Sequence, residues 1–93
     1  MTILPEQCRA ARGLLNWTQE QLAVEAGVSR STIKDFECHR HMLHRSTELL
    51  LIEAFEKGGI ELLFHANDGP GVGVCIRQAG LEAGGLTKSR NGA

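Results

Sequence analysis

The sequence has no tyrosine, one tryptophan and two prolines, and its apolar runs are short. A helix that crosses a bilayer needs about 20 consecutive, mostly apolar residues, so we expect no membrane-spanning helix and no membrane partner. The first residues, Met1 to Glu6, lack the charged and apolar regions of a secretory signal. These absences favour a soluble, cytoplasmic protein.

The cysteine pattern does not indicate a disulfide framework. Cys8, Cys38 and Cys75 are odd in number and far apart in the sequence, which favours free thiols in a reducing compartment. Cys38 is also close to three histidines, but their spacing matches no standard zinc site. We therefore expect no bound metal, and loop histidines that aid phosphate binding at low pH are the plainer interpretation.

Signatures of catalysis are lacking as well. The sequence has no glycine-rich phosphate loop ahead of a helix, no paired carboxylates at convergent helical spacing and no serine elbow. The glycine-rich residues 69–73 precede a strand pattern, which favours a hairpin turn over a phosphate cradle. An enzyme is not indicated, and no cofactor is expected.

A strong excess of either charge is missing too, because 10 Lys and Arg residues nearly balance 11 Asp and Glu residues. Their distribution is uneven. Residues 29–45 are rich in basic side chains, and most acidic residues come later. A basic face can therefore coexist with a net charge of -1, and overall neutrality does not exclude a nucleic-acid partner.

The chain of 93 residues is long enough for one small core. Pro5 suits a first helical turn, and apolar spacing predicts a helix from Pro5 to Leu15. A capping box between Thr18 and Gln21 predicts a second helix from Gln19 to Ala26. Two short helical patterns thus follow each other closely.

A glycine separates the second pattern from a third. Gly27 is suited to a left-handed residue that ends a helix, and Ser29 can cap a new one from Arg30 to about Cys38. Only Ile33 and Phe36 give this third helix an apolar stripe. Its other face is therefore expected to be polar and exposed.

A fourth helix is predicted up to Lys57, capped by Ser46 or Thr47 and ended by two glycines. Residues 49–52 are four consecutive large aliphatics, which is more than a one-sided stripe requires. A second buried surface is implied, either as extra core or as a contact between subunits.

After Gly59 the apolar period changes to two. Residues 60–65 read as a strand, 67–71 as a turn, and Val72, Val74 and Ile76 as alternating positions of a second strand. An isolated hairpin is marginal in water, so it must pack on the helices or pair with a strand of another chain. We thus predict a helical unit over residues 1–59, a hairpin over 60–78 that can serve as a dimer contact and a disordered tail over 79–93.

The helices around Gly27 have the anatomy of a helix-turn-helix. Four segments resemble the DNA-binding domain shared by the lambda and 434 phage repressors, Cro and the xenobiotic-response-element (XRE) regulators: Gln19–Ala23, Ala26–Ser29, Thr32–Ile33 and Phe36–Glu37. The resemblance covers about residues 4–57. It implies a mainly α fold, a four- to five-helix lambda-repressor-like domain, here with a short C-terminal β-hairpin.

The resemblance also implies site residues. Matching positions predict base contacts by Arg30, Ser31, Lys34 and Asp35, and phosphate contacts by Thr18, Gln19, Ser29, Arg40 and Arg45. An arginine can bond both acceptors of a guanine edge, and an aspartate can accept from cytosine; Asp35 would otherwise restrain Arg30 or a neighbouring basic side chain. Many members have a Glu-x-Gly turn after the third helix, where this sequence has His39 in place of the glycine.

We therefore expect a sequence-specific regulator of transcription, a repressor that binds double-stranded DNA at an inverted repeat as a homodimer. Dimerisation is predicted at the fourth helix and the hairpin, by Leu50, Ile52, Val72, Val74 and Ile76. The alternative is a protein-interaction module, such as an antitoxin or accessory subunit with a protein partner and secondary DNA binding. Near-neutral charge and the apolar residues 49–52 favour this alternative.

Overall fold

Four helices and one hairpin make up the described part of the chain. The structure is a computed structural model and describes residues 2–77. Its elements are α1 Pro5–Leu15, α2 Gln19–Ala26, α3 Arg30–Glu37, α4 Arg45–Lys57, β1 Ile60–Phe64 and β2 Gly71–Ile76. The predicted mainly helical fold with a C-terminal hairpin is confirmed. The predicted tail, residues 79–93, lies outside the described residues.

The local signals at α2 act as predicted. The Thr18 hydroxyl accepts a hydrogen bond from the Gln21 backbone N–H at 3.0 Å, and the Gln21 side chain accepts one from the Thr18 N–H at 2.7 Å. At the other end Gly27 has a φ of 70°, in the left-handed region. Glycine adopts this conformation without the steric penalty of a Cβ, which fixes where α2 ends.

The start of α4 differs from the prediction. The helix begins at Arg45 with His44 as its N-cap, and no side chain caps it. Ser46 and Thr47 therefore lie inside the first turn, and the expectation that one of them caps the helix is wrong. The first turn is held instead by Glu48, whose carboxylate accepts from the Ile3 N–H at 2.7 Å. This long-range contact ties α4 to the N-terminal segment.

The hydrophobic core lies where the helices meet the hairpin. Phe55, Leu22, Ile33 and Leu51 are fully buried, and Trp17 stacks on Phe55 with a centroid distance of 6.2 Å. The aliphatic run of α4 divides between two environments, which are the core for Leu51 and Ile52 and the surface for Leu49 and Leu50. Because Ile52 is 6% exposed, the prediction that it contacts a second subunit is wrong for this side chain.

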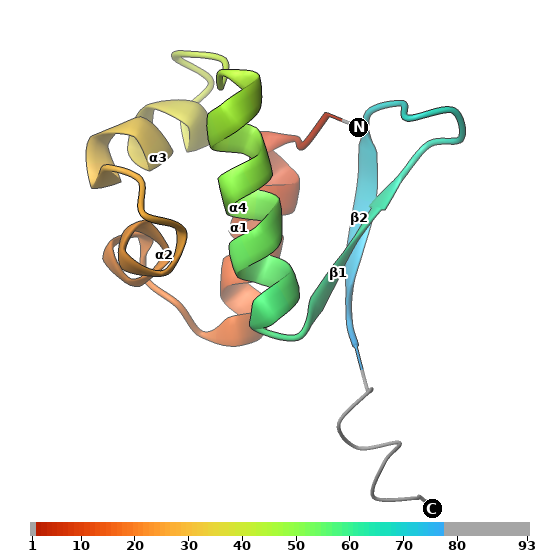
Figure 1. Cartoon of the computed structure of the whole chain (residues 1–93), viewed down its shortest axis with the longest axis horizontal. Helices are drawn as coiled ribbons and strands as arrows, with labels where there is room; N and C mark the ends of the chain where they lie inside the picture. Colours follow the sequence, from red (N-terminus) through yellow and green to blue (C-terminus); the bar gives the residue numbers. More distant parts are fainter. Residues whose placement is uncertain (1, 78–93) are drawn as a thin grey trace, which may run out of the picture.

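The molecule has three layers (Figure 1). The helices α2 and α3 lie on one side, α1 and α4 in the middle, and the antiparallel hairpin on the other side, with α1 against β2 and α4 against β1. Within residues 2–77 no helix is long and apolar enough to cross a membrane. The contacts of α1 with β2 and of α4 with β1 show that the hairpin packs on the helices, which is one of the two arrangements predicted for it.

Gln7 of α1 fastens the hairpin to the helical layers. Its side chain is 4% exposed and donates to the carbonyls of Leu63 and Gly73 at 2.8 and 2.9 Å, while its oxygen accepts from the Leu4 N–H at 3.1 Å. A Cβ at Gly71 would collide with the Gln7 amide. The close approach of helix and strand therefore requires glycine at this position.

Candidate nucleic-acid interface

A tight turn orients α3 against α2. Gly27 and Val28 both donate from their backbone N–H to the Ala23 carbonyl, at 2.9 and 3.0 Å, and this closes the end of α2. The Ser29 hydroxyl then accepts from the Thr32 N–H at 3.2 Å and caps α3, as predicted. The two helices are thus joined by a short connection that is held by hydrogen bonds at both of its ends.

The helix α3 has one buried and one exposed face. Ile33, Phe36 and Glu37 are buried, whereas Arg30 and Lys34 are exposed. Neither of these two cations has a hydrogen bond or ion pair to any residue in the range 2–77. Ser31 is also exposed, and its hydroxyl lies 3.3 Å from that of Ser29. The exposed face of α3 therefore presents two cations without a partner among the described residues, together with the Ser31 hydroxyl.

Asp35 lies at the border of this surface and is half-buried. Within residues 2–77 no ion pair joins it to Arg30 or to another basic side chain. The expectation that Asp35 restrains a basic neighbour is therefore not met in this conformation. Asp35 lines a small pocket together with His41 and His44 of the loop after α3.

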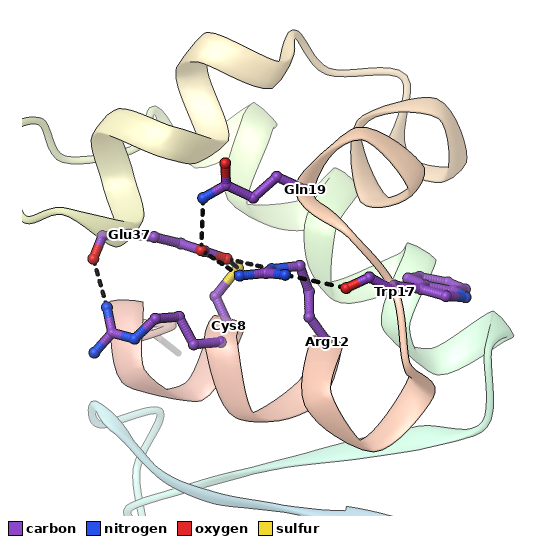
Figure 2. Close-up of polar contacts among 6 residues, drawn as sticks. Cys8, Arg12, Trp17, Gln19 and Glu37 are labelled. Atoms are coloured by element: carbon purple, nitrogen blue, oxygen red, sulfur yellow. Dashed lines mark hydrogen bonds and ion pairs between the residues drawn. The ribbon is translucent and has the colours of Figure 1, made fainter.

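A buried carboxylate connects α3 with α1 and α2. Figure 2 shows the side chains of Cys8, Arg12 and Gln19 converging on Glu37. Arg12 donates to both carboxylate oxygens of Glu37 at 2.8 Å, and Gln19 donates to one of them at 2.9 Å. The Cys8 thiol donates to the other oxygen at 3.0 Å. We call these four residues the Glu37 cluster.

The electrostatics of the Glu37 cluster follow from this geometry. Burial by itself would raise the pKa of Glu37, but hydrogen bonds from Arg12, Gln19 and Cys8 outweigh it and lower that pKa overall. The same carboxylate raises the pKa of Arg12 through their hydrogen bonds. Burial, together with the neighbouring carboxylate, raises the pKa of the Cys8 thiol. Glu37 is therefore charged at neutral pH, and Cys8 remains a protonated donor.

Sequence reasoning missed the Glu37 cluster. The partners of Glu37 are 18 to 29 residues away in the chain, and no periodicity links them. The cluster also defines the role of Gln19, for which a phosphate contact is predicted. One amide hydrogen of Gln19 is committed to Glu37, so the side chain is held in place at the first turn of α2.

The remaining predicted phosphate contacts lie at helix starts and in the loop after α3. The hydroxyls of Thr18 and Ser29 act as helix caps at exposed positions. Arg40 and Arg45 have exposed side chains, and Arg45 donates to the buried Glu48 at 2.9 Å. Helix N-termini carry partial positive charge that attracts phosphates, so the caps and the cations lie on parts of the surface suited to a polyanion.

His39 makes the turn after α3 at the position where many XRE-type regulators have glycine. Its φ is 63°, in the left-handed region, and the chain reverses so that the Arg40 N–H donates to the Asp35 carbonyl at 2.8 Å. The imidazole lies 3.1 Å from the Glu6 carboxylate, and both groups are exposed. The turn is therefore made without glycine, in a conformation that strains a side-chain-bearing residue.

The loop after α3 contains several histidines and borders a pocket. Among residues 2–77, no three His, Cys, Asp or Glu side chains are placed to hold a metal ion. The loop also borders a mostly apolar pocket of about 390 Å³ between Ile3, Phe36 and Leu43. The loop is attached to the core at both ends of this pocket, because Phe36 of α3 is part of the core and Leu43 of the loop packs against it.

A comparison with protein families gives one match. The family model described as Helix-turn-helix, of the XRE type, matches residues 9–37, from the second turn of α1 to the last residue of α3. This span contains the whole Glu37 cluster except Cys8. Curated protein sequences give no match to the chain. The family match supports DNA binding and transcription regulation as the class of function.

Proposed function

We propose that this chain, whose residues 9–37 are a helix-turn-helix of the XRE, lambda-repressor-like kind, is a sequence-specific repressor that occupies an inverted-repeat operator as a homodimer. One observation carries the proposal. Arg30 and Lys34 are exposed on α3 without a partner in the described chain, while the opposite face of the same helix is buried. A helix held in this way can enter the major groove by its N-terminal end.

Base reading is assigned to the exposed face of α3. Arg30 is at the first position of the helix, where its guanidinium can bond the two acceptors of a guanine edge. Ser31, Lys34 and Asp35 complete the face. Each good pair of this kind contributes about 1 to 3 kcal/mol of discrimination between bases.

Phosphate binding is assigned to residues that flank this face. They share a position at a helix start or in the following loop, and they are Thr18, Gln19, Ser29, Arg40 and Arg45; all are exposed except the half-buried Gln19. Phosphate contacts fix orientation and carry no sequence information. Because they release counterions, affinity should fall steeply as salt concentration rises.

The homodimer is assigned to apolar side chains on the hairpin and α4. Val72 and Ile76 are 53% and 51% exposed, and Leu49 and Leu50 of α4 are 45% and 42% exposed. Val74, which lies between Val72 and Ile76 in β2, is half-buried. Dimers of this class bind half-sites about one helical turn apart, roughly 34 to 36 Å.

Selection of bound fragments from the host's genomic DNA tests the proposal. The bound fragments should share an inverted repeat, and footprinting should show protection of both halves. Arg30→Ala is expected to lower affinity for the selected site by about 1 to 3 kcal/mol and to relax one base position in each half. Arg40→Ala should weaken selected and random DNA alike, and Lys57→Ala, at the far end of α4, serves as the matched control. Equal losses for Arg30→Ala on selected and random DNA would refute its assignment as a base reader.

The second candidate is a protein-interaction module that binds a different protein through α4 or the hairpin. The exposed Leu49 and Leu50 favour it, because they lie on α4 rather than on the reading helix. Molecular mass in solution separates the two candidates. A self-contained dimer supports the repressor, whereas an aggregation-prone monomer that selects no DNA sequence supports the module.

A further inference from the structure

The strand β2 has one unpaired edge. The Arg77 N–H donates to the Gly59 carbonyl, and Cys75 is paired with Glu61 in the same register. In an antiparallel pair, alternate residues direct their N–H and C=O groups towards the partner strand. The main-chain groups of Val74 and Ile76 therefore point away from β1. The sheet formed by residues 2–77 has only two strands, so these groups have no strand beside them.

The unpaired edge is short, and its limits are defined. At its start the Gly71 N–H donates to the Thr2 carbonyl at 2.8 Å, which occupies the edge there. The register shifts between Leu63 and Phe64, so Val72 is passed over in the pairing and the alternation is interrupted. Regular outward-facing groups therefore remain at Val74 and Ile76.

The side chains at this edge are apolar and incompletely covered. Ile60 and Ile76 are cross-strand partners on the helix-facing side of the hairpin, yet Ile60 is 1% exposed and Ile76 is 51% exposed. Natural proteins block free edges with lysine, proline or inward-pointing charges. The segment from Val72 to Ile76 contains none of these, and it is suited to pairing with another strand.

We infer that the outer edge of β2 pairs with the same edge of a second copy of this chain, antiparallel and centred on Cys75. The inference rests on the homodimer of the proposed function and specifies its interface. A residue whose main-chain N–H and C=O groups point away from β1 can form hydrogen bonds only with a partner residue of the same kind. Val74 therefore lies opposite the partner's Ile76, and Ile76 opposite the partner's Val74. Each of these pairs makes two main-chain hydrogen bonds.

This register agrees with the side chains on the strand. Each Ile76 gains the partner's Val74 as a β-branched neighbour, a kind of pair that stabilises sheets. Arg77 lies opposite the partner's Gly73, so no like charges face each other directly. Cys75 lies opposite the partner's Cys75 in a non-hydrogen-bonded pair, where Cα atoms are about 4.5 Å apart.

The resulting dimer also suits an inverted repeat. Antiparallel edge pairing of identical strands places the two-fold axis perpendicular to the sheet. All four helices lie on one side of the hairpin, with α2 and α3 farthest from it (Figure 1). Both copies of α3 therefore lie on the same side of the four-stranded sheet, facing away from it, as two half-sites on one face of DNA require.

Cross-linking of the full chain tests the register. In the Cys38→Ser variant, a mild oxidant that accepts the two electrons of the two thiols should link Cys75 to the partner's Cys75, because their Cα separation is within the disulfide range. The Cys38→Ser, Cys75→Ser double variant should not form the link. In that background Val74→Cys should not link to itself, since those positions would be roughly 8 Å apart. An equimolar mixture of Val74→Cys and Ile76→Cys should link.

A second experiment tests the proposed interface separately from the existence of a homodimer. Ile76→Glu should convert the dimer to a folded monomer. Glu53→Gln, at an exposed position of α4, is the control. A dimer that persists in Ile76→Glu, or that links through Val74→Cys and not through Cys75, would overturn the inference and leave the homodimer standing. A parent chain that is monomeric at every concentration, and on its selected DNA, would overturn both.

Discussion

The Arg12 guanidinium holds the Glu37 carboxylate with two hydrogen bonds of 2.8 Å, and it also donates to the Trp17 carbonyl at 3.0 Å. One side chain of α1 therefore contacts both the last residue of α3 and the residue that precedes the α2 cap. This side chain therefore links α1 to the end of α3 and to the connection that leads into α2.

Glu37→Gln is expected to lower the free energy of unfolding by about 3 kcal/mol. Breaking a buried ion pair costs about 3 to 5 kcal/mol, and the lower end applies because Arg12 retains 19% side-chain exposure. Urea unfolding followed by circular dichroism measures the loss. Glu6→Gln is the control, since it removes only an exposed carboxylate paired with His39 and should lower the midpoint much less than Glu37→Gln does. Equal midpoints for both variants would contradict a structural role for the Glu37 cluster.

Acid should destabilise the protein partly through Glu37. Its carboxyl has a pKa below the ordinary 4.5 in the folded state, so the unfolded chain takes up the proton first. The stabilisation is complete above about pH 4.5 and is lost as pH falls through the folded pKa. Unfolding free energies measured from pH 6 to pH 3 should therefore decline less steeply in Glu37→Gln than in the parent. The parent slope also includes Glu6, whose pKa is lowered chiefly by a backbone hydrogen bond.

His39→Gly should stabilise the fold. A side-chain-bearing residue at a φ of 63° costs roughly 1 kcal/mol relative to glycine, and part of this gain is offset by the greater freedom of glycine in the unfolded chain. His39→Ala is the matched control, because it removes the contact with Glu6 but keeps the strained backbone. Thermal midpoints should rank glycine above alanine. The reverse order would show that the imidazole, and not the backbone, determines stability at this turn.

Gly71→Ala should loosen the hairpin. The added Cβ would displace the Gln7 amide, which makes three hydrogen bonds in a buried position. Buried polar groups that lose their partners cost about 1 to 3 kcal/mol. Amide hydrogen exchange should accelerate in β1 and β2 more than in α3. Gly13→Ala, on the exposed side of α1 with nothing near its Cβ, should not accelerate exchange.

The elements of this fold were predictable where a single residue decides the backbone locally. Thr18 and Ser29 start helices because their hydroxyls satisfy free N–H groups, and Gly27 ends one because it tolerates a positive φ. These effects act over three or four residues, so they are visible in the sequence. The exposed cations of α3 were predictable for the same reason, since helical period separates them from Ile33 and Phe36.

Contacts between distant segments were not predictable. Glu48 accepts a hydrogen bond from the Ile3 backbone N–H 45 residues away, and no local pattern indicates this contact. Gln7 reaches Leu63 and Gly73 across similar separations, and Glu37 gathers partners from two other helices. Each is a buried polar group whose partner is set by the folded arrangement. A long polar side chain on an otherwise apolar helix face was the only signal available.

The stacking of Trp17 on Phe55 gives this protein a built-in optical reporter. The chain has one tryptophan and no tyrosine, so its near-ultraviolet emission comes from an indole that lies between the start of α2 and the C-terminal end of α4. A shift in that emission would report separation of the start of α2 from α4. Conformational changes confined to the hairpin would leave the tryptophan emission unchanged.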